Sequence, residues 1–301
     1  AMVKLGISIG PMDGTDAESL LLKADTALLR AKQTTEGALQ FFSGEMIEHL
    51  AQRFAIETGL RQALLEQQLV IQYQPQVSAQ DSRLVGCEAL IRWRRNGSLV
   101  PPSQFIAVAE ETGLIVPITE WILAQVARQI RAWDAEGLHL PSVSVNISAR
   151  HFQQAQIVES FVHILRAEGV APQRICLEIT EGALADPVQC EPKLLALKQA
   201  GFEISIDDFG TGYSSLSYLK RFRLDELKID RSFVDGIEAD ESDRAIVEAT
   251  LAMAHRLGMR VVAEGVETPA QQAFLQQKGC ELLQGYLFSK PIDPNDLHRL
   301  Q

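Results

Sequence analysis

The sequence predicts an α/β protein whose main part is a (β/α)8 TIM-like barrel with an antiparallel first strand. Two observations lead to this prediction. Eight short apolar runs alternate with helical segments over about 230 residues, which is typical of parallel α/β barrels. The connection between the first two runs, residues 78–83, is too short for a crossover helix, so these two strands should be antiparallel. A doubly wound open sheet is the alternative architecture.

The first 43 residues differ from the rest of the chain. Residues 3–10 form a predicted strand, Thr15 to Glu18 form a capping box for a helix that reaches about Lys32, and residues 38–42 form a second short strand. One helix and two strands bury too little surface to be stable alone. We therefore interpret residues 1–43 as the tail of a larger domain whose beginning is absent.

Residues 44–68 follow as a predicted connecting helix, and residues 69–301 form the expected barrel. The predicted strands of the barrel cover residues 70–75, 84–93, 143–148, 175–180, 202–208, 226–230, 260–264 and 282–288. The predicted helices between them cover residues 118–133, 158–167, 192–199, 243–257 and 269–278.

The composition is that of a globular protein. An apolar fraction of 46% excludes a disordered or collagen-like chain. No run approaches the roughly 18 apolar residues of a membrane span, and the first residues lack the pattern of a signal peptide. The net charge of −11, without a basic run, argues against binding to DNA or RNA polymers or to membrane surfaces.

Cysteine and histidine spacing argues against zinc. The four cysteines are far apart without a Cys-x-x-Cys pair, and the six histidines show no metal-binding spacing. We expect the cysteines to be buried thiols in a reducing compartment, which favours a cytoplasmic location. Membrane tethering of a longer parent protein stays open.

Polar residues recur on one face of the predicted strands. Because side chains alternate across a strand, Asn146, Glu178 and Lys228 each lie opposite apolar neighbours. In a parallel barrel the carboxyl ends of the strands converge at the top, where active sites lie. One acid means little when 39 of 301 residues are acidic, but strand interiors avoid acids. Four acids interrupt the apolar runs: Glu88, Glu178, Asp207 and Glu264.

Converging carboxylates repel one another unless a counter-charge lies between them. Hard divalent cations supply that charge, and carboxylates with an amide oxygen predict a magnesium or manganese cluster of two ions. Such a cluster suits phosphate esters. Asp207 and Asp208 are adjacent, so both can face the ions only if the strand ends between them. The glycine-bearing segment 209–212 favours that ending, and it is equally compatible with an ordinary turn.

A series of motifs resembles the EAL-domain family of cyclic di-GMP phosphodiesterases from about residue 60 to the end of the chain. The motifs are residues 73–75 (YQP), 88–93 (EALIRW), 146–148 (NIS), 178–181 (EITE), 207–212 (DDFGTG), 228–230 (KID), 263–267 (AEGVE) and 284–286 (QGY). The resemblance implies a (β/α)8 barrel and hydrolysis of cyclic di-GMP to linear pGpG by a water that two metal ions activate.

The resemblance also implies roles for individual residues. The implied metal ligands are Glu88, Asn146, Glu178, Asp207 and Asp208. Glu264 would be the general base, and Lys228 would steady the water or the developing charge. Arg92 would contact a phosphate and Gln74 a guanine. The other residues that match the substrate site are Leu90, Asp230, Glu267 and Gln284. No position departs from the family pattern, so we expect an active enzyme.

Glu181 is implied to hold the loop 208–215, which in the family links metal binding to dimer contacts, and a homodimer through the barrel is therefore expected.

Residues 6–10 (GISIG), 23–32 (KADTALLRAK) and 39–42 (LQFF) resemble the end of a GGDEF diguanylate cyclase domain. The cyclase signature itself is absent from the sequence, so we expect no cyclase activity. The chain is interpreted as the C-terminal part of a GGDEF–EAL protein.

Two other functions stay open at this point. The chain could be a receptor that binds cyclic di-GMP without cutting it, or a barrel hydrolase of another substrate. The complete set of metal ligands favours the phosphodiesterase. Mg²⁺ or Mn²⁺ should support it, and Ca²⁺, which has a larger radius and looser geometry, should inhibit it.

Overall fold

The computed structural model describes residues 3–33, 39–95, 97–210, 219 and 221–300. These residues form two compact units, Ala1–Gln62 and Ala63–Gln301. None of the helices in the described part combines the length and apolar composition needed to cross a bilayer.

The first unit contains a small parallel sheet and two helices. Strand β1 (Leu5–Ile7) pairs with β2 (Leu39–Phe41), and the helices are α1 (Ala17–Gln33) and α2 (Gly44–Leu65), whose last turn belongs to the second unit. The carboxylate of Asp16 caps α1 by accepting a hydrogen bond of 2.8 Å from Ser19 N. The N-cap is thus Asp16, one residue later than the Thr15 of the expected capping box, because the charged Asp16 is the stronger acceptor at a helix N-terminus.

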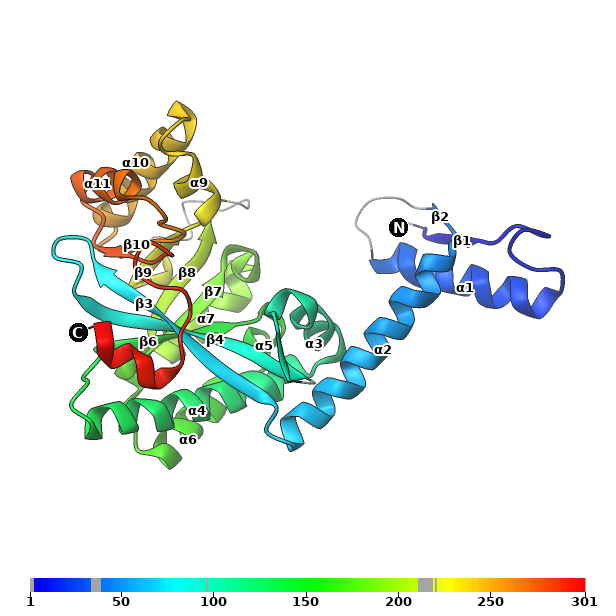
Figure 1. The fold of residues 1–301 in the computed structure, drawn as a ribbon, viewed down its shortest axis with the longest axis horizontal. Coiled ribbons are helices and arrows are strands. Elements are labelled where there is room, and N and C mark those ends of the chain that lie inside the picture. Colours follow the sequence, from blue (N-terminus) through cyan, green and yellow to red (C-terminus); the bar gives the residue numbers. More distant parts are fainter. Residues whose placement is uncertain (1–2, 34–38, 96, 211–218, 220, 301) are drawn as a thin grey trace. The chain divides into compact units, whose positions relative to one another are not determined.

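The second unit is a closed barrel (Figure 1). Its strands are β3 (Leu69–Ser78), β4 (Leu84–Arg95), β6 (Ser142–Ile147), β7 (Ile175–Thr180), β8 (Glu203–Phe209), β9 (Glu226–Ile229), β10 (Arg260–Ala263) and β11 (Leu282–Leu283). β3 pairs antiparallel with both β4 and β11, and all other neighbours in the ring are parallel. The predicted barrel with an antiparallel first strand is confirmed, and the open sheet is excluded.

Helices follow the strands on the outside of the barrel. They are α3 (Ile106–Thr112), α4 (Ile115–Ala135), α5 (Ala149–Phe152), α6 (Ile157–Glu168), α7 (Pro187–Ala200), α9 (Arg231–Gly236), α10 (Glu241–Arg256) and α11 (Pro269–Gln277). A short strand, β5 (Ser98–Val100), extends β4 in a hairpin. The predicted long helices are all present, whereas α3, α5 and α9 were not predicted because one or two turns give little periodicity.

The last strand is much shorter than the expected range of residues 282–288. Gly285 lies against the backbone of Val266, where a Cβ would come within 2.1 Å of the Val266 oxygen. Leu287 N then donates to Val266 O, so the chain turns away from the sheet after Leu283. This glycine ends the pairing, and the apolar residues after it belong to the turn that follows.

The strands bury apolar side chains on their outward face, beneath the helices. On β6 and β7 these are Val143, Val145, Leu177 and Ile179, all 0% exposed. The alternation of side chains therefore turns the polar residues of the same strands into the barrel. The packed outer layer fixes which residues reach the interior.

Candidate active site

A buried lysine lies at the centre of a ring of carboxylates inside the barrel. Lys228 on β9 is 1% exposed. Its Nζ lies 2.7 Å from Glu264 Oε1 and 2.9 Å from Glu178 Oε2. Glu88 Oε2 and Asp207 Oδ1 follow at 3.3 and 3.4 Å. Four strands thus direct an acid at one ammonium group, which agrees with the convergence expected from the sequence.

Strand register explains why these side chains meet. β6 and β7 pair in parallel so that Asn146 lies beside Glu178, and Lys228 on β9 lies beside Val262 on β10, two residues before Glu264. Asn146 Nδ2 donates to Glu88 Oε1 at 2.6 Å, which joins β6 to β4. The sheet itself therefore assembles the cluster from residues far apart in the sequence.

Asp207 and Asp208 both reach the cluster, but the strand does not end between them as expected. β8 continues to Phe209, and its pairing with β9 is irregular between Ile206 and Phe209. Asp208 has a left-handed backbone with φ of 54°, a conformation that Asp tolerates better than most residues. The kink turns both carboxylates the same way, and oxygens of Asp207, Asp208 and Glu264 lie within 4.8 Å of one another.

The charges of the cluster change its protonation. Burial raises the pKa of Glu264 to about 7 despite the nearby Lys228, and burial together with Glu88 raises the pKa of Glu178 well above its ordinary value. Burial would also raise the pKa of Glu88, but Lys228, Gln284 and Asn146 outweigh it and hold that pKa low. Burial opposes the charge of Lys228, but Glu178 and the other acids raise its pKa well above normal. The cluster therefore retains protons near neutral pH.

The cluster fits divalent metal ions by its charge and by its donors. Four carboxylates contact one ammonium and Asp208 lies beside them, so four formal negative charges are left, which two divalent cations would balance. Glu178 Oε1 is buried without a hydrogen-bond partner. An orphaned carboxylate oxygen among hard oxygen donors suits a hard cation.

The residues expected to contact substrate lie around Glu88 and near the open end of the barrel. Gln284 Nε2 donates to Glu88 Oε2 at 2.6 Å and to Gln74 Oε1 at 3.3 Å. Arg92 is half-buried, and its Nε donates to Gln72 Oε1 at 3.1 Å. Leu90 lines a mainly apolar hollow of about 250 Å³ that also borders Asn146 and Glu110. Gln284 and Gln74 thus border the carboxylate cluster at Glu88.

Asp230, Glu267 and Glu181 have local partners. Asp230 caps α9 by accepting from Ser232 N at 3.0 Å, and Glu267 pairs with Arg231 at 2.8 Å. Glu181 Oε2 accepts from Gly210 N at 3.2 Å, just after Asp207 and Asp208. The rest of the expected loop, residues 211–215, lies outside the described residues.

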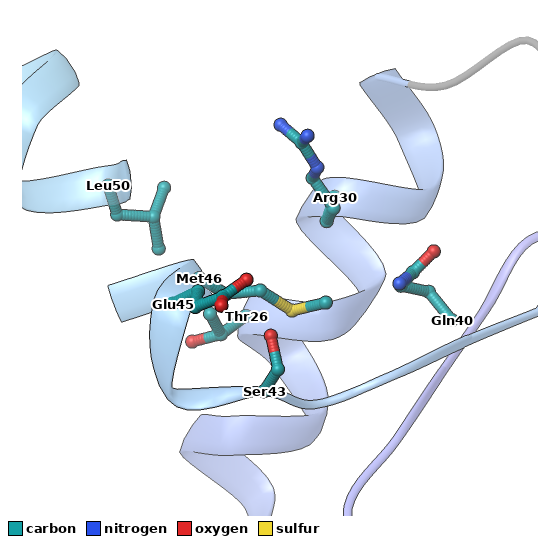
Figure 2. A pocket seen from close by; sticks show the side chains of 7 residues that line it. All are labelled: Thr26, Arg30, Gln40, Ser43, Glu45, Met46 and Leu50. Atoms are coloured by element: carbon teal, nitrogen blue, oxygen red, sulfur yellow. The ribbon is translucent and has the colours of Figure 1, made fainter. Parts of the chain in front are cut away.

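A second hollow, in the first unit, has a different character. Its volume is about 280 Å³. Figure 2 shows its lining side chains, among them Thr26, Ser43, Met46, one base, Arg30, and one acid, Glu45. It has no cluster of acids comparable to the one in the barrel. We therefore place the chemistry in the second unit.

Two inward-facing glutamines of β3, Gln72 and Gln76, were not identified as site residues from the sequence. Gln72 accepts from Arg92, and Gln76 Nε2 donates to Gln284 Oε1 at 3.0 Å. The spacing of Gln72, Gln74 and Gln76 at every second position could have identified them, because alternate residues of a strand share one face.

A (β/α)8 barrel with an acidic centre at the carboxyl ends of its strands is typical of metal-dependent enzymes. Within that class the chain belongs to the EAL domain family, which matches residues 57–291. The resemblance found in the sequence is confirmed.

Named relatives support this assignment. The chain is 43% identical over 290 residues to the cyclic di-GMP phosphodiesterase NbdA of Pseudomonas aeruginosa, covering 96% of this chain and 37% of that protein. It is 42% identical over 296 residues to MucR of the same organism, a bifunctional diguanylate cyclase/cyclic di-GMP phosphodiesterase, covering 97% of this chain and 43% of that protein. The chain spans about two fifths of the length of these relatives.

A solved structure supports the same assignment. The PaMucR phosphodiesterase in its c-di-GMP complex is 44% identical and has a TM-score of 0.78. The match covers 81% of this chain and 99% of that chain.

The raised pKa of Glu264 predicts an unusual pH dependence of stability in the metal-free protein. Between an ordinary pKa of 4.5 and the folded value of about 7, the folded state binds more protons than the unfolded state. Stability should therefore fall as pH rises through this window, by up to about 3 kcal/mol. The stability of the Glu264→Gln variant should fall less over the same pH range. At pH 8 in EDTA the variant should melt several degrees above the unmodified chain.

The measurement is thermal unfolding in EDTA at pH 5 and pH 8. Glu248→Gln, an exposed acid paired with Lys278, is the matched control and should keep the original pH dependence. An equal change of melting temperature between pH 5 and pH 8 in Glu264→Gln and in the unmodified chain would contradict the assignment of a protonated Glu264.

Proposed function

We propose that this chain hydrolyses cyclic di-GMP to linear pGpG. The observation that carries the proposal is the ring of four carboxylates around Lys228 at the top of the barrel, with Asp208 beside it. NbdA and MucR, which are named as cyclic di-GMP phosphodiesterases, support the choice of substrate. The negative charge of the carboxylates would repel an anionic substrate, so substrate binding requires bound cations.

The proposed ligands of two Mg²⁺ or Mn²⁺ ions are Glu88, Asn146, Glu178, Asp207 and Asp208. When bound, such ions polarise the phosphodiester and lower the pKa of a bound water. The protein residues supply hard oxygen donors and hold them in place through the sheet. Asn146 has to turn its amide oxygen toward an ion, since its Nδ2 is already committed to Glu88.

Glu264 is the proposed general base. A base works best when its pKa is near the working pH, and burial brings the pKa of Glu264 to about 7. Lys228 donates to Glu178 and lies 2.7 Å from Glu264, so it can stabilise negative charge on a water oxygen or a phosphate. Its elevated pKa keeps it charged throughout the neutral range.

The substrate is proposed to lie across the edge formed by β3 and β4. Arg92 would contact a phosphate and Gln74 a guanine. Leu90 borders the apolar hollow of about 250 Å³ beside Asn146, which is suited to a flat base. The remaining proposed substrate contacts are Asp230, Glu267 and Gln284.

Residues 1–43 are proposed to be the remnant of a GGDEF-like domain, residues 44–68 a connecting helix, and residues 69–301 the EAL barrel. The bifunctional name of MucR supports such an arrangement. We also propose a homodimer through the barrel, with Glu181 holding the loop after Asp208. Four buried free cysteines support a reducing, cytoplasmic location.

A receptor that binds cyclic di-GMP without cutting it is the alternative function. It would need none of the acids beyond those that contact the ligand. Keeping like charges buried together has an electrostatic cost. The number of carboxylates therefore favours the enzyme.

The proposed function predicts metal-dependent formation of pGpG. With Mg²⁺ or Mn²⁺ the chain should convert cyclic di-GMP to pGpG, and EDTA should abolish the reaction. Ca²⁺ should bind but inhibit, because its looser coordination does not position the water. Chromatography of the products over time is the measurement. Glu88→Ala is the inactive comparison, and Glu248→Ala is the exposed acid control.

Full activity in excess EDTA would contradict the metal centre. Binding without any turnover in Mg²⁺ and Mn²⁺ would favour the receptor. Hydrolysis of a simple phosphodiester at a comparable rate would favour a barrel hydrolase of other substrates.

Glu264→Gln is predicted to separate binding from catalysis. The substitution keeps size and hydrogen bonding and removes basicity, so turnover should fall by about 10²–10⁴. Affinity for cyclic di-GMP in Ca²⁺ should change little. Single-turnover rates in Mg²⁺ and calorimetric titration in Ca²⁺ measure the two effects. Equal losses in rate and affinity would contradict the role of Glu264 as a base and indicate a metal ligand.

A further inference from the structure

A row of three hydrogen-bonded glutamines, Gln74, Gln76 and Gln284, lies inside the barrel beside and beneath Glu88. Gln76 and Gln284 are 5% and 3% exposed, and both are far from solvent for such polar side chains. Gln74 completes the row. Buried amides of this kind need partners for both ends of the group.

The hydrogen bonds of the row run in one direction, toward Glu88. Gln76 Nε2 donates to Gln284 Oε1 at 3.0 Å. Gln284 Nε2 then donates to Glu88 Oε2 at 2.6 Å. On the paired strands, Gln74 lies opposite Glu88 and Gln76 lies opposite Gly86, so Gln76 is one step deeper in the barrel.

Gly86 provides the space that Gln76 occupies. A Cβ at position 86 would lie 3.0 Å from Gln76 Oε1, closer than such contacts normally are. The missing side chain on β4 therefore allows a long amide on β3 to fill the interior at this level.

The direction of the row matters because an amide has one donor end and one acceptor end. If the amide of Gln284 rotated by half a turn, its oxygen would face the carboxylate of Glu88, and two acceptors would meet. The N–H of Gln76 favours the orientation in which Gln284 Oε1 points away from Glu88. Such selection is strong in a dry interior, where an unpaired polar group is costly.

We propose that Gln76 is a positioning residue for the metal centre: it orients Gln284, which in turn holds the carboxylate of Glu88. The proposal rests on the function proposed above, in which Glu88 is a metal ligand. Groups that orient a ligand without touching the metal commonly change metal affinity by about 10–100-fold. Gln76 acts one hydrogen bond further away, so its effect should be smaller.

The test is a double-mutant cycle read by Mn²⁺ affinity in the absence of substrate. Methionine keeps the length of the unbranched side chain and removes the hydrogen bonds. Gln284→Met should weaken Mn²⁺ binding by about 10–100-fold, and Gln76→Met by about fivefold, as expected for one lost neutral hydrogen bond. Because Gln76 acts through Gln284, the double variant should bind within about twofold of Gln284→Met.

Gln271→Met is the matched control. Gln271, on α11, is 4% exposed, and its side chain hydrogen-bonds the backbone of Val234, Glu267 and Thr268 rather than the glutamines or the carboxylate cluster. Its substitution should lower the melting temperature and leave Mn²⁺ affinity unchanged. A loss of stability alone is thus distinguished from a loss of positioning.

Unchanged Mn²⁺ affinity in Gln76→Met, or losses that multiply in the double variant, would overturn the proposal. Failure of the proposed function is seen separately, since the unmodified chain would then form no pGpG or would bind no Mn²⁺. A normal unmodified chain with an unaffected Gln76→Met variant refutes the positioning role alone.

Discussion

The ammonium of Lys228 has to balance more negative charge than it carries. It contacts four carboxylates within 3.4 Å and is 1% exposed, so neither water nor bulk ions screen the repulsion among those acids. Protons on Glu178 and Glu264 reduce the excess when no cation is present. Two divalent ions, as proposed for this site, would remove it more completely and release those protons. The proposed metal binding and the retention of protons would then be two consequences of the same imbalance.

The barrel makes this arrangement possible because it supplies rigid supports from many strands. Apolar faces packed under the helices fix the orientation of each strand, and the alternation of side chains then turns the acids inward. The antiparallel β3 adds glutamines to the interior, which orient Gln284 and, through it, Glu88. A site of this kind is difficult to build on loops, since an acid that turned toward water would avoid the repulsion.

The architecture was predicted well from the sequence, because the order of strands and helices depends on local patterns. Short apolar runs alternated with helices, and the brief connection after β3 identified the antiparallel strand. The kink at Asp208 was not predicted, because it depends on the pairing of β8 with β9. The early end of β11 depends on the approach of Gly285 to Val266, a contact between distant segments. The convergence of Glu88, Glu178, Asp207 and Glu264 on Lys228 was predicted only in outline, since its distances are set by strand register.

Calorimetric titration of Mn²⁺ into the metal-free chain tests the charge balance most directly. At pH 6.5, in two buffers of different ionisation enthalpy, the titration gives both the number of ions and the number of protons released. The imbalance around Lys228 predicts two ions per chain and a net release of protons, since burial keeps Glu178 and Glu264 protonated in their absence. Binding of a single ion without proton release would contradict it.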